Sequence, residues 1–182
     1  GFHAFPLLIT EISLDSTGQM IYFASGLRIS KIDSSDWSES ATFTASGDSR
    51  FAGFKSLRLD PSNGDVIAVF KSASLVGSFV SPTTYELQAF RQDLSGRESL
   101  AALGTRPWDM EISSRGSFAI VTDYLDQTAT RIDLNTHETT VINLYHRYGA
   151  IAGEYMVAIS PDESFALVGG SGFIDRINLE TN

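Results

Sequence analysis

Residues 107–123 read PWDMEISSRGSFAIVTD, and variants of this phrase occur three more times in the chain. The other copies are ITEISLDSTGQMIYFA at 9–24, FKSLRLDPSNGDVIAVF at 54–70 and YMVAISPDESFALVG at 155–169. When the copies are aligned on Leu14, Leu59, Ile112 and Ile159, they recur at intervals of 45, 53 and 47 residues. A phrase that recurs at such a period indicates a repeated structural unit.

Each copy has the pattern of a β-hairpin. In the third copy, Met110 and Ile112 alternate with polar residues, which predicts a strand with one buried face. The turn Ser113–Gly116 follows, and after it the apolar run 118–121 predicts a strand that is buried on both faces. The fourth copy has Glu163 where the other copies have Gly, which predicts a looser turn there.

A third strand follows each hairpin, and a fourth strand is visible in all copies except the last. Residues 91–103 are the best competitor for a helix, but Gly96 disfavours one and the region is predicted to be two strands joined by a turn. We therefore predict an all-β fold made of four-stranded antiparallel meanders of roughly 45 residues, the period of a β-propeller blade.

The predicted blades form one propeller segment in which the last blade is incomplete. Their approximate bounds are 7–47, 52–104, 107–145 and 154–182. A single sheet of this kind cannot bury both of its apolar faces, so neighbouring blades are expected to pack face to face. The missing last strand favours a portion of a larger propeller of about six or seven blades.

Composition limits the function. The 182 residues carry a formal net charge of −9, which argues against a general binder of nucleic-acid backbones. The chain has no cysteine, which excludes disulfides and thiolate-based zinc sites. No run of apolar residues is long enough to span a bilayer directly, and nothing in the sequence indicates a compartment. The start, GFHAFPLLIT, lacks an initiator Met and is typical of a fragment or a processed product.

The residues TRPWDMEISSRGSFAIVTD at 105–123 resemble the repeat of NHL and YVTN-type propellers and of the related lactonase-like propellers. In that family a Pro precedes the innermost strand, and Thr122-Asp123 matches the end of its second strand. The phrases YMVAISPDESFALVGG and DRINLETN have the same style. The resemblance implies a β-propeller but leaves the function open, because this fold is used by scaffolds, enzymes and receptors alike.

In this topology the links between blades and the loops between second and third strands share one mouth, where partners are expected to bind. Trp108, Tyr145 and Tyr148 lie in or beside such links. Tyr and Trp are overrepresented at interface positions that dominate binding. The long insertion 71–86 carries Phe79, which could contact a partner or fold back onto its own blade.

The primary expectation is a non-catalytic protein-interaction or scaffold module, with a protein partner and with the rest of the propeller or another chain completing the ring. The alternative is a lactonase-like hydrolase that acts at the central channel, with or without a divalent metal. For this alternative the resemblance implies His146, Arg106 and Glu154. A structural subunit of a large assembly is a further alternative. No motif of a serine hydrolase, zincin or P-loop protein is present.

No cofactor is expected, with calcium left open as one possibility. Asp123 and Asp126, together with Glu154, could offer oxygen ligands to Ca²⁺. However, two acids in one loop more often form a solvated loop in which an Asp accepts hydrogen bonds from nearby backbone N–H groups.

Overall fold

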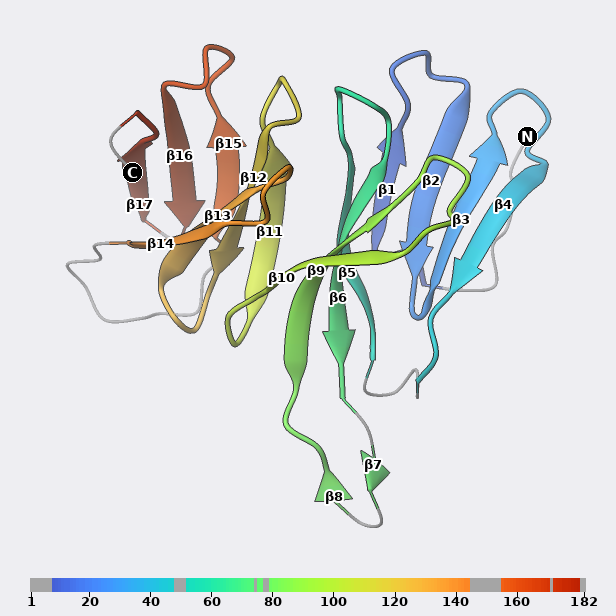
Figure 1. The fold of residues 1–182 in the computed structure, drawn as a ribbon, viewed down its shortest axis with the longest axis horizontal. Coiled ribbons are helices and arrows are strands. Elements are labelled where there is room, and N and C mark those ends of the chain that lie inside the picture. Colours follow the sequence, from blue (N-terminus) through green and yellow to red (C-terminus); the bar gives the residue numbers. More distant parts are fainter. Residues whose placement is uncertain are drawn as a thin grey trace. The chain divides into compact units, whose positions relative to one another are not determined.

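The computed structural model describes residues 8–47, 52–73, 75–76, 79–144, 155–170 and 172–180, with the backbone alone at 75–76 and 79–80. Within these ranges the chain contains strands and no helix, and therefore no helix that could span a membrane. Four antiparallel sheets follow one another along the chain, and we call them blades 1 to 4 (Figure 1). The predicted all-β fold, a β-propeller portion of about four blades, is confirmed.

The strands of each blade are given in chain order. Blade 1 consists of β1 (Glu11–Leu14), β2 (Met20–Ser25), β3 (Arg28–Asp33) and β4 (Glu39–Thr44). Blade 2 consists of β5 (Gly53–Leu59), β6 (Val66–Ser72), β9 (Thr84–Phe90) and β10 (Glu98–Ala102). Blade 3 consists of β11 (Pro107–Ile112), β12 (Phe118–Asp123), β13 (Thr128–Asp133) and β14 (Thr139–Asn143). Blade 4 consists of β15 (Met156–Ile159), β16 (Phe165–Gly170) and β17 (Phe173–Asn178).

Each blade is a meander in which consecutive strands pair, apart from the insertion in blade 2. The apolar runs form the second strands, and all six residues of β12 are buried, as predicted for a strand covered on both faces. Residues 91–103 form no helix, because β9 ends at Phe90 and β10 begins at Glu98 after a turn. Blade 4 has three strands among the described residues, in agreement with the predicted incomplete blade.

The first hairpin turn is built in the same way in the first, third and fourth copies. In blade 3 the N–H of Gly116 donates to the carbonyl of Ser113 over 2.9 Å. The hydroxyl of Ser113 accepts a hydrogen bond from the N–H of Phe118, the first residue of the next strand. In blade 4 the N–H of Glu163 donates to the carbonyl of Ser160 over 2.8 Å. Glu163 has a φ of 61°, close to the 69° of Gly116, so the predicted looser fourth turn is wrong.

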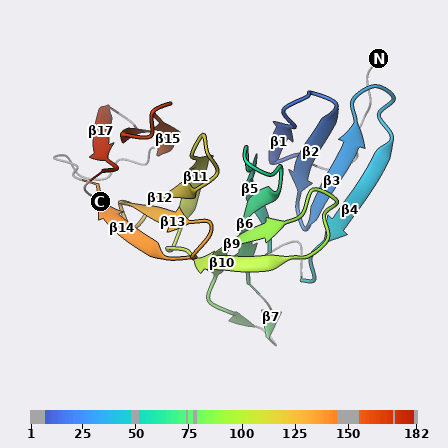
Figure 2. The same ribbon diagram turned by 45° about the horizontal axis from the view of Figure 1, so that its top comes forward.

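The insertion 71–86 continues the β6–β9 hairpin into a second, smaller one. Strands β7 (Leu75–Val76) and β8 (Phe79–Val80) pair with each other, with Leu75 opposite Val80. Figures 1 and 2 show this small hairpin beyond the ends of β6 and β9. The side chain of Phe79 lies outside the described part of the structure, so its contact with a partner stays a prediction.

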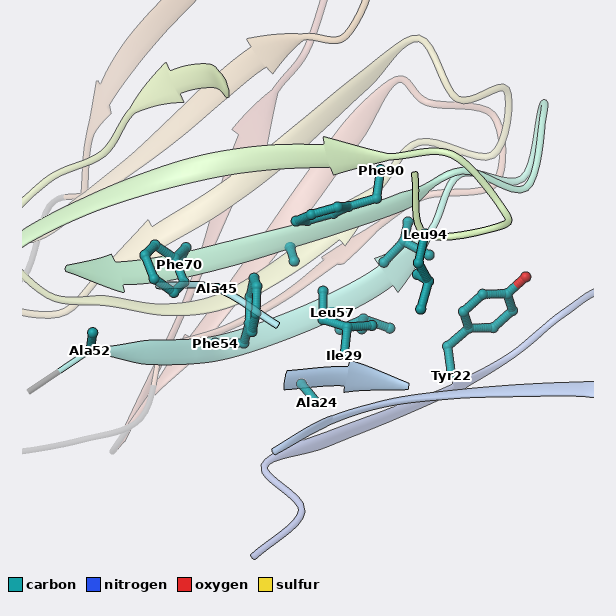
Figure 3. Close-up of a cluster of buried hydrophobic side chains, with 12 residues drawn as sticks. Tyr22, Ala24, Ile29, Ala45, Ala52, Phe54, Leu57, Phe70, Phe90 and Leu94 are labelled. Carbon is teal, nitrogen blue, oxygen red and sulfur yellow. The ribbon is translucent and has the colours of Figure 1, made fainter. Parts of the chain in front are cut away.

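The described residues divide into two compact units, of which the first holds blades 1 and 2 and the second holds blades 3 and 4. In the first unit the blades pack face to face around Phe54, Leu57 and Phe90 (Figure 3). The ring centroids of Phe54 and Phe70 are 5.0 Å apart, and the buried Ile29 of blade 1 belongs to the same core. Backbone bonds also join the blades, since the N–H of Phe54 donates to the carbonyl of Gly26 over 2.8 Å.

The second unit repeats this arrangement with different residues. Phe118 and Ile120 of blade 3 share a buried cluster with Ala166 and Val168 of blade 4. Two side chains of blade 3 bind the innermost strand region of blade 4. The hydroxyl of Thr122 donates to the carbonyl of Tyr155 over 2.5 Å, and a carboxylate oxygen of Asp109 accepts from the N–H of Val157 over 3.0 Å. The two blades of this unit are therefore held together by apolar packing and by side chain–backbone bonds.

Candidate protein-interaction surface

In the second unit, the link that leads into β11 lies against the loop that follows β12. The N–H of Tyr124 donates to the carbonyl of Arg106 over 3.1 Å. In return, a carboxylate oxygen of Asp123 accepts a hydrogen bond from the N–H of Arg106 over 2.7 Å. The link and the loop belong to segments 17 or more residues apart in the sequence, so these bonds fix the part of the blade where the topology predicts a binding mouth.

Asp123 and Asp126 accept hydrogen bonds from the backbone of this loop and link. The second carboxylate oxygen of Asp123 accepts from the N–H groups of Leu125 and Asp126, each over 2.9 Å. Asp126 accepts from both the N–H and the hydroxyl of Thr105, over 2.9 and 2.8 Å. Each of the four carboxylate oxygens thus accepts at least one hydrogen bond, as in a loop capped by Asx-type turns. A cation-binding role for the two acids stays a prediction.

Gly104 allows the two carboxylates to approach the link closely. A Cβ atom at this position would lie 2.5 Å from Oδ2 of Asp123 and 2.7 Å from Oδ2 of Asp126. Both distances are shorter than any real Cβ contact, so a larger residue would push the carboxylates out of place. The absence of a side chain at Gly104 is therefore a condition for this loop geometry.

A row of aromatic rings crosses the same end of the unit, from blade 3 to blade 4. The ring centroids of Trp108 and Tyr124 are 6.4 Å apart, those of Tyr124 and Tyr155 are 5.8 Å apart, and those of Tyr155 and Phe173 are 5.4 Å apart. The guanidinium of Arg106 lies 5.5 Å from the centroid of Tyr124. Aromatic pairs at such distances stabilise one another beyond their burial, so each ring supports its neighbour.

The row includes the buried Tyr155 and ends at the exposed Trp108. Tyr155 is buried, and this burial, together with the neighbouring Tyr124 and Asp175, raises the pKa of its phenol above the ordinary value. In contrast, Trp108 is 41% exposed and Leu125, beside Tyr124 in the loop, is 56% exposed. We define the mouth surface as Arg106, Trp108, Tyr124 and Leu125. It combines an indole, an aliphatic side chain and a cation on a hydrogen-bonded support.

The polar groups next to the mouth surface are engaged within the protein. The carboxylates of Asp123 and Asp126 accept hydrogen bonds from N–H and O–H donors, and burial raises the pKa of the Tyr155 phenol. Among the described residues, no group of three or more His, Asp or Glu side chains is arranged to hold a metal ion. An exposed indole with rigid support is the type of group that dominates protein–protein contacts.

The structure places some of the candidate residues and leaves others outside its described part. Trp108 and Arg106 come together at the mouth surface, next to the Asp123 and Asp126 loop. The remaining candidates, His146, Glu154, Tyr145 and Tyr148, lie outside the described residues. Sequence reasoning missed Leu125 and Phe173. An apolar residue within the polar loop DYLDQT was the available signal for Leu125.

The fold and this surface define a class of protein, one that carries β-propeller blades. No protein-family model matches the chain, and no curated protein matches it. Solved structures do match. The β-propeller domain of Cps50 (Swd1) from Myceliophteria thermophila superposes with a TM-score of 0.63 at 13% identity, over 92% of this chain and 51% of that chain.

Two further structures support the same architecture. Raptor from Chaetomium thermophilum matches with a TM-score of 0.68 at 12% identity, over 96% of this chain and 16% of that chain. A chain of a nidogen/laminin complex matches with a TM-score of 0.66 at 10% identity, over 96% of this chain and 62% of that chain. The chain thus spans about half the length of the Swd1 chain that it matches. At these identities the likeness shows the fold alone.

Proposed function

We propose that this chain is a non-catalytic protein-interaction module that binds a protein partner through the mouth surface. The observation that carries the proposal is the indole of Trp108, which is exposed and supported by Tyr124, together with the exposed Leu125 that follows Tyr124 in the loop. A large apolar side chain loses contact with water when a partner covers it, which favours association. Because Tyr124 and the carboxylate-bound loop already hold the surface in place, little conformational entropy is lost on binding.

The support beneath the surface agrees with this function. Asp123 is buried, and its carboxylate accepts hydrogen bonds from the N–H of Leu125, next to Tyr124, and from the N–H of Arg106 in the link. Arg106 adds a cation whose guanidinium lies over the Tyr124 ring and can also donate to a partner's carbonyl or carboxylate. The matched propeller chain of the nidogen/laminin complex is consistent with a protein partner for this fold. We further propose kinship with NHL and YVTN-type repeats, on the sequence phrases at 105–123, 155–170 and 175–182.

The test compares two tryptophans of equal exposure. Trp108 is 41% exposed on the mouth surface, and Trp37 is 40% exposed in the turn between β3 and β4. We expect Trp108→Ala to weaken partner binding by about 2 kcal/mol, roughly 30-fold, as at other dominant interface positions. Trp37→Ala is expected to leave binding unchanged. Proteins recovered on each immobilised variant are quantified by mass spectrometry, and unfolding curves confirm that both variants remain folded.

A fluorescence experiment gives an independent readout, because the chain has only two tryptophans. In Trp37→Phe the indole of Trp108 is the sole tryptophan. Its emission is expected to shift to shorter wavelength when a recovered partner is added, since binding would remove the ring from water. Equal recovery on wild type and on Trp108→Ala, together with an unchanged emission, would overturn the proposed function.

A further inference from the structure

The mouth surface carries a cation that has no acidic partner among the described residues. The side chain of Arg106 is exposed, and its guanidinium lies 5.5 Å from the ring centroid of Tyr124. Within the described part of the chain, this guanidinium forms no ion pair and donates no hydrogen bond. Its N–H donors are therefore open to water and remain available for another molecule.

A comparable arginine in blade 2 shows what Arg106 lacks. The guanidinium of Arg97 lies 5.6 Å from the ring centroid of Phe70, which is nearly the same arrangement. Arg97, however, also donates to a carboxylate oxygen of Glu86 over 2.8 Å. Two arginines of the same unit form ion pairs as well, Arg28 with Glu39 and Arg58 with Glu11. At the mouth surface the corresponding carboxylate is missing from the described residues.

The aspartates closest to Arg106 in the loop use their oxygens on other donors. Asp123 is buried and accepts from the N–H groups of Arg106, Leu125 and Asp126. Both carboxylate oxygens of Asp126 accept from Thr105, one from its N–H and one from its hydroxyl. Hydrogen bonds of this kind hold a carboxylate in place and favour its charged form. The two acids therefore stabilise the loop and the link, and neither contacts the guanidinium as an ion pair.

The exposed indole of Trp108 and the guanidinium of Arg106 lie next to the same ring. Both are within 6.4 Å of the ring centroid of Tyr124. An extended peptide advances about 3.3 Å per residue, so a segment of roughly three or four residues can contact both groups. The mouth surface therefore offers an apolar contact and a cation at a spacing that one short segment can cover.

The open cation decides which occupant fits this surface. A partner that covers the indole of Trp108 also removes water from the nearby guanidinium, and burial of an unpaired guanidinium costs free energy. An occupant that is apolar throughout is therefore disfavoured. A Lys or Arg of a partner would be repelled by Arg106 and would find the oxygens of Asp123 and Asp126 already in use. A carboxylate, in contrast, can accept two parallel hydrogen bonds from the planar fork of Arg.

We propose that the mouth surface binds a short extended segment of a protein partner in which an Asp or Glu lies within roughly three residues of a large apolar side chain. The carboxylate of this segment pairs with Arg106, and its apolar side chain covers Trp108. The inference rests on the proposed function, because it specifies the partner of the same surface. It adds the sign of the partner's charge and the length of the segment that is recognised.

The probe is a phage-displayed library of random dodecapeptides, selected on the immobilised full chain. Peptides that wild type retains and Trp108→Ala loses are expected to share an Asp or Glu close to an aromatic or aliphatic residue. The most enriched of these peptides is synthesised, together with a second version in which every Asp or Glu is replaced by Asn or Gln. Titration calorimetry then measures the affinity of both peptides for the purified chain.

Two arginine variants show whether the carboxylate pairs with Arg106. Arg106→Gln removes the open cation, and Arg97→Gln is the matched control because it makes the same change at a ring-stacked arginine that is already paired with Glu86. We expect Arg106→Gln to weaken binding of the acidic peptide about 10-fold, and Arg97→Gln to leave it unchanged. The amide version should bind equally to wild type and to Arg106→Gln, and only the acidic peptide should lose affinity as NaCl is raised. Unfolding curves check that both variants are folded.

The results separate this inference from the proposed function. Peptides that depend on Trp108 but have no carboxylate, or that are rich in Lys or Arg, overturn the acidic partner and leave the mouth surface as a binding site. Equal affinity of the acidic peptide for wild type and Arg106→Gln does the same. A library that yields no Trp108-dependent peptide also overturns the inference, whereas the proposed function is then decided by the recovery of proteins on Trp108→Ala and Trp37→Ala.

Discussion

Glu163 shows how one residue can combine an unfavourable backbone with a favourable side chain. Its φ of 61° lies in the left-handed region, where the equivalent positions in the other blades have Gly. A residue with a Cβ atom is disfavoured there by about 1–2 kcal/mol. Its carboxylate, however, accepts from the hydroxyl of Ser114 over 2.8 Å and from the N–H of Arg115 over 2.9 Å. These bonds connect the turn of blade 4 to the equivalent turn of blade 3.

Two substitutions separate the two contributions. Glu163→Ala removes the hydrogen bonds and keeps the strain, so we expect it to lower the free energy of unfolding by about 1–2 kcal/mol. Glu163→Gly removes both, and it is expected to be less destabilising than Glu163→Ala by up to about 1 kcal/mol, because relief of strain is partly offset by the flexibility of unfolded Gly. Urea unfolding measures both values. Equal stability of wild type and Glu163→Ala would show that the bonds to blade 3 contribute nothing.

At the scale of the element, the hairpins could be predicted from sequence and the loop contacts could not. The alternation at Met110 and Ile112 and the run 118–121 depend on residue type alone, which is why strands β11 and β12 are visible in the sequence. The fourth turn was mispredicted because the carboxylate of Glu163 has its partners in another blade. Contacts of this kind depend on the packed structure.

The same reason limited the prediction of the candidate site. Sequence reasoning identified Trp108, and it grouped Asp123 with Asp126 as possible calcium ligands. It could not show that these carboxylates accept hydrogen bonds from the N–H groups of Thr105 and Arg106, which lie in a link earlier in the chain. Nor could it show that the ring of Tyr124 lies beside Trp108. The register of a hairpin follows from the alternation of apolar residues in the sequence, whereas the contact between two loops depends on the folded structure.

The close approach at Gly104 gives a prediction for this element, with a matched control in the neighbouring blade. In Gly104→Ala the added Cβ would lie 2.5 Å from Oδ2 of Asp123, so the link and the loop must separate. We expect a loss of about 1–3 kcal/mol in the free energy of unfolding, the usual cost of overpacking. Gly169→Ala, where no atom lies within 4 Å of the added Cβ, should change stability by less than about 1 kcal/mol. Similar unfolding midpoints for the two variants would contradict the close approach of the link to the Asp123 and Asp126 carboxylates at Gly104.

At the scale of the whole molecule, the carboxylates in the turns make the stability of the fold depend on pH. Many of the acidic side chains behind the net charge of −9 lie in turns and accept hydrogen bonds there. The hydroxyl of Thr17 and the N–H of Met20 hold the pKa of Asp15 below its ordinary value. The N–H groups of Thr136 and Asn135 do the same for the pKa of Asp133. Asp65 is an exception, because burial and the nearby Asp60 raise its pKa.

A carboxylate with a lowered pKa in the folded state contributes stability above its unfolded pKa, and that stability is lost as the pH falls through the folded pKa. Below about pH 5 the unfolded chain therefore binds more protons than the folded chain, and stability decreases toward about pH 2. Asp65, whose pKa is raised, has the opposite effect on the pH dependence of stability. The pKa values of Asp15, Asp133 and Asp162 are lowered, so the loss of stability in acid prevails. The urea midpoint is thus expected to fall steadily with acidification.

The other copies of the repeat suggest a variant that tests whether the turn carboxylates cause this loss of stability in acid. Blades 3 and 4 have Ser113 and Ser160 at the position of Asp15, and their hydroxyls accept the same hydrogen bond from the first N–H of the next strand. Asp15→Ser should therefore keep the turn near neutral pH, with a change below about 1 kcal/mol, while it removes one titrating group. The acid dependence of the urea midpoint is expected to be shallower in Asp15→Ser than in wild type. Parallel curves for the two proteins would mean that Asp15 does not contribute to the acid sensitivity of the fold.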